Sequence, residues 1–169
     1  MKETKILSPS EWTENPFTLI GKEWMLVAAE KDGRVNAMTA AWGGLGVLFG
    51  KNVAFVFIRP QRYTKEFVDA ADTMSLTFFG EEYREMMGYM GKASGRDEDK
   101  VAKAGLTVVH DGETPYFEEA RLTLIGRKLY AQDMKEACFM DSVQPERWYP
   151  EKDFHTLYVI ELEKILSAE

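Results

Sequence analysis

Two arginines lie at one corner of the sequence, where an apolar run gives way to a helical pattern. Residues 55–67 read FVFIRPQRYTKEF, which places Arg59 and Arg62 beside the hydroxyls of Tyr63 and Thr64. The start of a helix has unpaired N–H groups and a partial positive charge, and guanidinium groups add paired donors that suit phosphate oxygens. The corner can therefore bind one phosphate group. The alternative is a solvated turn, in which the arginines pair with nearby carboxylates and the threonine only caps the helix.

A second basic stretch, GKASGRDEDK, occupies residues 91–100. Ser94 has an aspartate three residues later, which is the spacing of a capping box with Asp in place of the usual Glu. This pattern predicts another helix N-terminus with basic side chains around it, and so a second place for an anion. A capped surface helix of mixed charge is the alternative interpretation.

A third stretch, NAMTAAWGG at 36–44, contains small polar and aliphatic residues and has Trp42 near its end. A strand of this kind can lay its backbone amides along a flat ring. A flavin needs such hydrogen bonds at its pyrimidine edge and apolar cover on the ring face. Taken alone, the stretch is also compatible with an ordinary barrel strand.

Other nucleotide and metal chemistries fit the sequence poorly. The run WGGLGVLFGKN at 42–52 has Leu45 where a Walker loop needs its first glycine and Asn52 where it needs Ser or Thr, so we predict a flexible glycine-rich turn. Phe49 takes the third glycine position of a dinucleotide fingerprint. The two histidines and the single cysteine do not lie at the short spacings typical of metal ligands.

The composition indicates one globular domain over residues 1–169. A net charge of −7 argues against broad nucleic-acid binding and against an anionic membrane surface. Cys138 is the one cysteine, so no internal disulfide can form. The N-terminal residues have no apolar segment of signal-peptide type, and no run approaches the roughly 20 apolar residues of a membrane helix. We expect a cytoplasmic protein.

The periodicity of the chain predicts more strand than helix. Strands are expected at 17–20, 24–30, 35–42, 52–58, 74–79, 106–110, 119–132 and 155–166, with a hairpin turn at 32–34. Short helices are expected from Tyr63, within 81–90, and from 95 to a closing Gly105. Strands that do not alternate with long helices favour an antiparallel barrel with inserted helices over a doubly wound sheet.

The three stretches occur together and in order, and an H-x-x-Y pattern follows at His155 and Tyr158. In these motifs the chain resembles flavin reductase-like proteins of the flavoredoxin and ferric-reductase group, over nearly its whole length. The resemblance implies a mainly β fold, an FMN-binding split β-barrel of antiparallel Greek-key type with a few short inserted helices. It also implies a homodimer with flavin sites near the subunit interface.

The resemblance assigns roles to four sets of residues. The isoalloxazine would be lined by Thr39, Ala40, Ala41 and Trp42. The ribityl phosphate would be held by Arg59, Gln61, Arg62, Tyr63 and Thr64. The segment that closes over the phosphate would contain Ser94, Gly95, Arg96 and Lys100. His155 and Tyr158 would approach the flavin from the last strand, in the same or the partner subunit. Many relatives have a glycine where this strand has Ile160, so we expect different packing there.

The implied function is that of an FMN-dependent oxidoreductase, which passes electrons from NADH or NADPH to a flavin, a ferric chelate or a protein. The sequence offers no convincing catalytic acid or base, and FMN would carry the redox chemistry. One alternative is a non-enzymatic FMN electron carrier that another protein reduces. Another is a flavin-free or haem-binding split barrel, which fits less well because haem needs no phosphate site.

Overall fold

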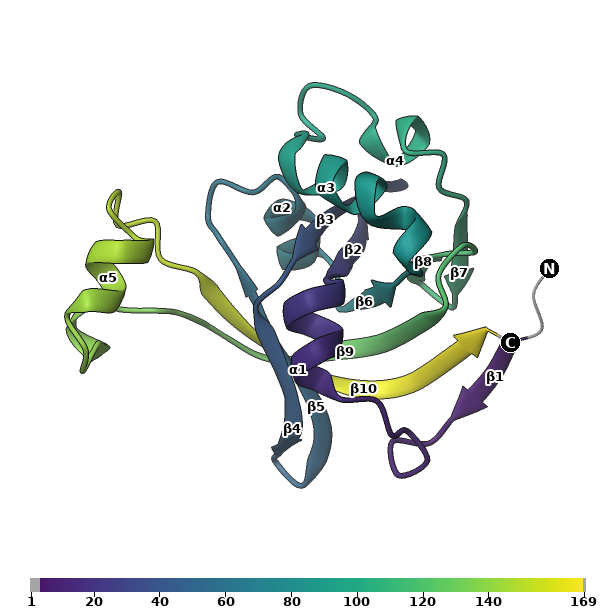
Figure 1. Cartoon of the computed structure of the whole chain (residues 1–169), viewed down its shortest axis with the longest axis horizontal. Coiled ribbons are helices and arrows are strands. Elements are labelled where there is room, and N and C mark those ends of the chain that lie inside the picture. The colour runs from purple at the N-terminus through teal and green to yellow at the C-terminus, as the bar shows by residue number, and fades with distance from the viewer. Residues whose placement is uncertain (1–3, 169) are drawn as a thin grey trace.

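The computed structural model describes residues 4–168, and its strands form one large and one small antiparallel sheet (Figure 1). The large sheet contains β1 (Thr4–Leu7), β2 (Met25–Lys31), β3 (Arg34–Ala40), β4 (Gly43–Leu48), β5 (Lys51–Ile58), β6 (Thr73–Phe78), β9 (Leu122–Asp133) and β10 (Thr156–Ala168). The small sheet contains β7 (Val108–Asp111) and β8 (Thr114–Phe117). The order in the large sheet is β3-β2-β6-β9-β10-β5-β4, and β1 pairs with β10. The prediction of a mainly antiparallel β fold is confirmed.

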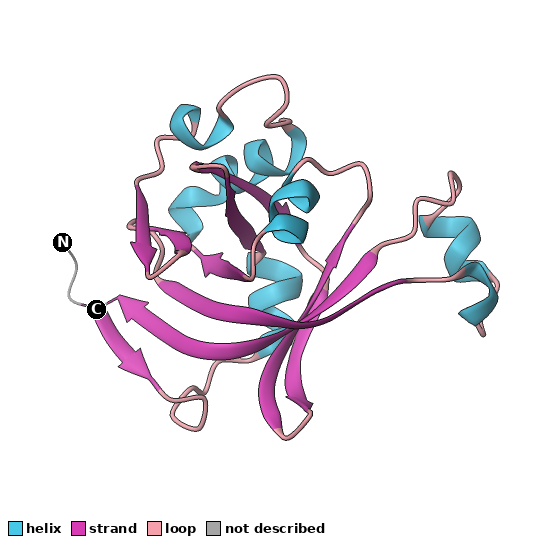
Figure 2. Cartoon of the chain, turned by 180° about the vertical axis from the view of Figure 1, so that it is seen from behind, coloured by secondary structure: helices cyan, strands magenta, loops and turns pink. Residues whose placement is uncertain are grey.

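The helices are short and lie mostly against the curved sheet (Figure 2). They are α1 (Pro16–Thr18) with the π-turn η1 (Leu19–Glu23), α2 (Thr64–Ala70), the 3₁₀ turn η2 (Glu81–Tyr83) with α3 (Arg84–Lys92), α4 (Lys100–Lys103), η3 (Glu136–Cys138) and α5 (Val143–Trp148). Residues 134–155, between β9 and β10, form an arm that carries η3 and α5 away from the rest of the fold (Figure 1). No helix among the described residues is long and apolar enough to span a membrane.

Strand β2 is buried on both faces and so joins two apolar clusters. Met25 and Val27 pack inside the barrel, in a cluster that includes Ile58 and Phe67. Leu26 points to the other face of β2 and packs in a second apolar cluster beneath α3. Successive side chains of a strand point to opposite faces, so a continuous apolar run is what such a two-sided strand requires. The run WMLVAAE fits this arrangement.

The prediction of a strand at 17–20 is wrong, because this segment is helical. Asn15 accepts a hydrogen bond from the backbone N–H of Phe17 at 2.9 Å, and Pro16 takes the first helical position. An N-cap asparagine followed by proline is a common helix start. These two signals outweigh the short apolar run that follows them.

The glycine-rich segment at 42–52, predicted to be a flexible turn, contains strand β4. Its pairing with β5 runs from Gly43 opposite Val56 to Leu48 opposite Lys51. The tight turn is confined to Phe49 and Gly50, which both have positive φ. A Cβ on Gly43 would lie 2.7 Å from the carbonyl oxygen of Phe55. Here the glycine permits close pairing of two strands, and the partner strand supplies the order that the sequence of β4 lacks.

The predicted capping box at Ser94 is also wrong. Helix α4 begins at Lys100, and Asp99 caps it by accepting a hydrogen bond from the N–H of Ala102 at 3.1 Å. Ser94 instead starts a turn, in which its carbonyl oxygen accepts from the N–H of Asp97 at 3.1 Å. Gly105, with φ of +71°, ends the short helix as predicted. The short strands β1 and β8 and the helix α5 were not predicted.

The side chain of Ile160 lies against Gly126 of the neighbouring strand. A Cβ on Gly126 of β9 would come within 2.6 Å of Ile160 Cδ1 and 2.9 Å of its Cγ1. Ile160 is fully buried in the barrel, and the register between β9 and β10 shifts beside it. Because Gly126 has no side chain, β9 leaves room for the bulky side chain of Ile160 on β10.

Candidate cofactor site

An open pocket lies where the end of β3, the end of β5 and the arm meet. Its volume is about 220 Å³. Its lining consists of Met38, Thr39, Ala40, Ala41, Trp42, Phe57, Arg59, Arg62, Trp148 and His155. The structure thus brings seven of the predicted site residues to one pocket, although they come from three separate stretches of sequence.

Strand β3, which is an edge strand of the large sheet, forms one wall of this pocket. Because β3 is the last strand in the order, one row of its backbone groups has no neighbouring strand. Thr39 ties this edge to α3 by donating its hydroxyl to the carbonyl oxygen of Met87 at 2.6 Å. The small residues Thr39, Ala40 and Ala41 line this wall of the pocket.

Aromatic side chains form another part of the lining. The rings of Trp42 and Trp148 meet edge-on with centroids 5.1 Å apart, and His155 lies 5.1 Å from Trp42. Phe57 contacts His155 with a centroid distance of 6.4 Å. Trp148 belongs to α5, so the arm contributes directly to the pocket. This part of the lining can cover a flat ring.

Arg59 and Gln61 are already bound to a carboxylate. Arg59 Nη1 and Gln61 Nε2 each lie 2.7 Å from Asp153 Oδ2. Arg59 Nη2 donates to the carbonyl oxygen of Trp148 at 2.8 Å, and the guanidinium lies 4.8 Å from the ring centre of Tyr149. Both predicted phosphate ligands therefore hold the arm in this structure.

Arg62 and Lys100 have a different environment, because their partners are only carbonyl oxygens. Arg62 Nη1 donates to Gly91 O at 3.1 Å, and its Nη2 is buried with no hydrogen-bond partner. Lys100 Nζ donates to the carbonyl oxygens of Met90 and Ala93, both at 3.0 Å. Within residues 4–168 neither cation has a carboxylate partner.

The pKa values of Arg62 and Lys100 show that holding both side chains in their charged form here is unfavourable. Burial lowers the pKa of Arg62 below its ordinary value. Burial, followed by the charge of Arg62, lowers the pKa of Lys100 to about 8. The carbonyl groups at the C-terminal end of α3 favour nearby cations, but two desolvated positive charges at one helix end also repel each other. An anion placed here would relieve both effects.

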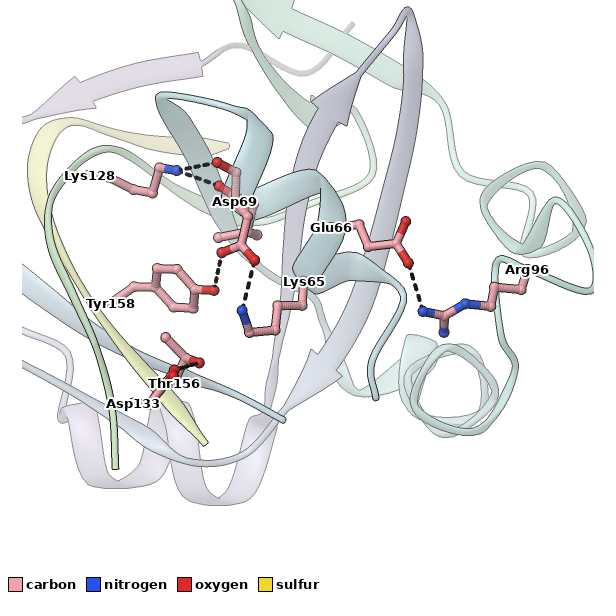
Figure 3. Close-up of polar contacts among 9 residues, drawn as sticks. Lys65, Glu66, Asp69, Arg96, Lys128, Asp133, Thr156 and Tyr158 are labelled. Atoms are coloured by element: carbon pink, nitrogen blue, oxygen red, sulfur yellow. Dashed lines mark hydrogen bonds and ion pairs between the residues drawn. The ribbon is translucent and has the colours of Figure 1, made fainter. Parts of the chain in front are cut away.

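The remaining residues of the arginine corner are mostly engaged with one another. Thr64 is buried and accepts a hydrogen bond from Asn36 Nδ2 at 2.8 Å, so it does not cap α2. Arg96 pairs with Glu66 at 2.8 Å (Figure 3), donates to Gln61 O at 3.0 Å and lies over the ring of Tyr63. These contacts fold the segment around Arg96 back onto the corner.

Gly95 is needed for that close approach. A Cβ at this position would collide with Asn36 Oδ1 and would lie 2.8 Å from Tyr63 Cδ1. Ser94, beside it, uses its hydroxyl to accept from the backbone N–H of Arg96 at 3.2 Å. Gly95 therefore lies where the loop that contains Ser94 and Arg96 meets β3 and the start of α2.

The structure separates the two residues of the H-x-x-Y pattern. His155 lines the pocket, whereas Tyr158 is buried in the barrel and donates its hydroxyl to Asp69 at 2.5 Å (Figure 3). Lys65 pairs with the same carboxylate at 2.7 Å. An odd spacing along an extended chain directs two side chains to opposite faces. Tyr158 is therefore not brought to the pocket with His155.

Three lining residues were missed by the sequence reasoning. Phe57 had an available signal, since it lies two residues before Arg59 and so on the same face of β5. Met38 directly precedes the predicted segment at the end of β3. Trp148 had no local signal, because only the folding of the arm brings it to Trp42.

Comparison with known proteins first defines the class. The "Flavin reductase like domain" model matches residues 18–167. The chain therefore belongs to the flavin reductase like domain family. No match was found among the curated proteins. The part of the chain that the structure describes contains no cluster of three or more His, Cys, Asp or Glu residues that could hold a metal ion.

Solved structures share the fold at low sequence identity. An FMN-binding domain of a flavin reductases-like enzyme from Shewanella baltica OS155 matches with a TM-score of 0.72 and 14% identity, over 99% of this chain and 78% of the other. A flavoredoxin from Methanosarcina acetivorans matches with 0.68 and 20%, over 87% and 69%. A Shewanella frigidimarina NCIMB 400 protein described as having a split barrel domain matches with 0.67 and 13%, over 89% and 71%. The split-barrel prediction is confirmed.

Proposed function

We propose that this chain binds FMN and acts as a flavin-dependent oxidoreductase. The observation that carries the proposal is the pair formed by half-buried Arg62, whose Nη2 is buried, and fully buried Lys100. Among the described residues, both donate to carbonyl oxygens and not to carboxylates. A site with two desolvated cations and an unpartnered guanidinium N–H fits a phosphate group, which offers several strong acceptors. Family membership and the FMN-binding relative from Shewanella baltica support the same cofactor.

The flat end of the cofactor fits the neighbouring pocket. At about 220 Å³ the pocket is smaller than the roughly 300–1,000 Å³ of cavities that enclose a whole ligand. It therefore suits the ring system, and the phosphate would lie at the part of the lining that Arg62 contributes. Thr39, Ala40, Ala41 and Trp42 would face the ring from the end of β3 and the two residues after it. Trp148, on the arm, would limit the exposure of the ring to water.

The other predicted phosphate ligands already have partners within the protein. Arg59 and Gln61 would reach the phosphate by exchanging the carboxylate of Asp153 for it. Gly95 and Arg96 of the loop lie against Tyr63, so the cofactor would meet the loop and the start of α2 as one preformed unit. Preformed contacts lower the entropy cost of binding.

Bound FMN would supply hydride and electron transfer. The chain itself would bind the phosphate, hold the ring between β3 and the arm, and limit access of water to it. No described residue needs to exchange a proton with the cofactor for this role. Arg59 and Arg62, as nearby positive charges, would favour a more negative state of a ligand in the pocket.

The first experiment is the visible spectrum of the purified protein with and without added FMN, followed by chromatography of any cofactor released by heat. A yellow protein that releases FMN supports the proposal. A protein that stays colourless with excess FMN contradicts it.

Electron transfer from NADH or NADPH to FMN is the enzymatic part of the proposal. Oxidation of either nucleotide by the FMN-loaded protein, with a ferric chelate or free flavin as acceptor, would support it. A loaded protein that oxidises neither nucleotide would instead be an electron carrier that another protein reduces. These assays distinguish an enzyme from an electron carrier, and neither outcome affects the proposal that the protein binds FMN.

We also propose that the protein forms a homodimer through the face between α1 and β4. Phe17 and Val47 are 87% and 72% exposed, and an apolar groove between these elements extends to Trp42. A second copy placed here would cover apolar surface beside the cofactor pocket. Light scattering after size-exclusion chromatography tests this. Phe17→Glu should yield monomers, whereas Ile6→Glu, at an exposed apolar position on β1, should not.

A further inference from the structure

Tyr149 and His155 form a hydrogen-bonded pair at the inner end of the arm. Tyr149 Oη lies 2.6 Å from His155 Nδ1, and the two residues are only 5% and 8% exposed. Their rings meet edge-on with centroids 5.5 Å apart. Because water is largely excluded, the position of the proton in this pair is set by protein groups.

The surroundings indicate that Tyr149 is the donor. The other acceptor near its hydroxyl is Met134 Sδ at 3.8 Å, and a thioether is a weak acceptor. An imidazole nitrogen with a free lone pair is a much better one. If Tyr149 donates to Nδ1, a neutral His155 must carry its own proton on Nε2.

Charged groups around the pair favour the neutral state of His155. Burial, followed by the charge of Arg59, lowers the pKa of His155 to about 4, although Asp153 acts in the opposite direction. Burial also raises the pKa of Tyr149 above its ordinary value. At neutral pH both groups are uncharged, so His155 can donate a hydrogen bond without carrying a charge.

The Nε2 side of the ring is available to a ligand. His155 lines the pocket beside Trp42 and Phe57. Among residues 4–168, Nε2 has no protein hydrogen-bond partner. We propose that Tyr149 fixes the tautomer of His155, so that Nε2–H donates to the carbonyl or carboxamide oxygen of a planar ligand in the pocket. The ligand part rests on the proposed function, whereas the tautomer does not.

Nitrogen NMR tests the tautomer without any ligand. The chain has two histidines, so ¹⁵N-histidine labelling gives two ring systems, and His110→Gln identifies the signals of His155. At pH 7 we expect an unprotonated Nδ1 and a protonated Nε2 for His155. Protonation of Nδ1, alone or together with Nε2, would overturn the proposal.

The Tyr149→Phe variant tests the positioning role. It keeps the ring that packs against Phe139 and Phe154 but removes the hydroxyl. We expect the two ring nitrogens of His155 to move toward averaged shifts, as in a histidine that samples both tautomers. Tyr130→Phe removes an exposed hydroxyl that bonds Gln132 and is the matched control. If Tyr149→Phe leaves the tautomer unchanged, Tyr149 has no positioning role.

A pair of probes tests the ligand part. Nicotinamide carries a carboxamide oxygen, and 3-methylpyridine has the same ring without it. We expect the protein as purified to bind nicotinamide about three- to tenfold more tightly, the size of one neutral hydrogen bond, and Tyr149→Phe to reduce this ratio. Equal binding of the two probes to the wild-type protein would overturn the carbonyl assignment, whatever the outcome with FMN.

Discussion

Arg59 at the end of β5 and Asp153 in the arm form an ion pair with 2.7 Å between Nη1 and Oδ2. The two residues are 94 positions apart in sequence, so the pair fastens the arm to the barrel. Gln61 donates to the same carboxylate oxygen, and no described residue donates to the buried Asp153 Oδ1. An internal anion thus occupies two donors that the sequence predicts for a phosphate.

Replacing Asp153 by alanine should strengthen FMN binding if that carboxylate competes with the phosphate. The pair is about one-fifth exposed, so we expect a gain of about 0.5–1 kcal/mol, or roughly two- to fivefold in Kd. Fluorescence titration measures it, and riboflavin, which lacks the phosphate, is the control. An unchanged Kd for FMN would assign Arg59 and Gln61 to the arm alone.

Arg62→Ala should weaken FMN binding by about 1.5–3 kcal/mol, the usual value of a hydrogen bond to a charged group. The affinity for riboflavin should stay the same, because Arg62 is assigned to the phosphate. Calorimetric titration with both flavins measures the difference. The exposed Arg127, which pairs with Glu161 far from the pocket, supplies the control variant Arg127→Ala. Equal losses for both flavins would place Arg62 at the ring.

Lys100 should give the folded protein a distinct pH dependence. Its pKa in the folded state is about 8, below the ordinary 10.5, so the unfolded chain binds more protons between these values. The contribution of Lys100 to the free energy of unfolding therefore rises from about pH 8 to 10.5. Urea unfolding of wild type and Lys100→Met across this range should show the wild type gaining stability relative to the variant. Parallel pH profiles would show that Lys100 titrates normally.

Replacing glycine by alanine should change the stability of the protein in opposite directions at two positions. Gly95→Ala should destabilise the protein by about 1–3 kcal/mol, because the new Cβ collides with Asn36 and Tyr63. Gly88→Ala, inside α3 with nothing within 4 Å of the new atom, should stabilise it by about 0.5–1 kcal/mol. Thermal unfolding compares them. If Gly95→Ala is as stable as the wild type, the loop does not pack as described.

Strong periodic segments of the fold could be predicted from the sequence. The strands around 24–30, 52–58, 74–79, 119–132 and 155–166 are apolar runs with clear limits, and each is present. The failures occurred where another part of the chain decides the structure. Glycines in β4 have little strand preference of their own, and β5 provides their pairing partners. At 17–20 the local cap at Asn15 and Pro16 outweighs a four-residue apolar run.

The site was predicted as far as its contacts are local. The corner at Arg62 and the end of β3 come from continuous stretches, and the pocket contains both. Trp148 and Asp153 reach the site through the arm, whose path no local pattern specifies. Tyr158 could have been excluded, because an odd spacing from His155 already places it on the other face of a strand.

The contact between Ile160 and Gly126 makes the volumes at these two positions interdependent. A small residue at 160 would remove the two closest contacts of a Cβ at 126 and leave the carbonyl oxygen of Glu161 at 3.1 Å, whereas a large residue at 160 requires glycine there. Substituting either position alone would leave a void or a clash, each of which lowers stability. Natural variants of this barrel should therefore change both positions together, and anyone engineering the last strand should treat them as one unit.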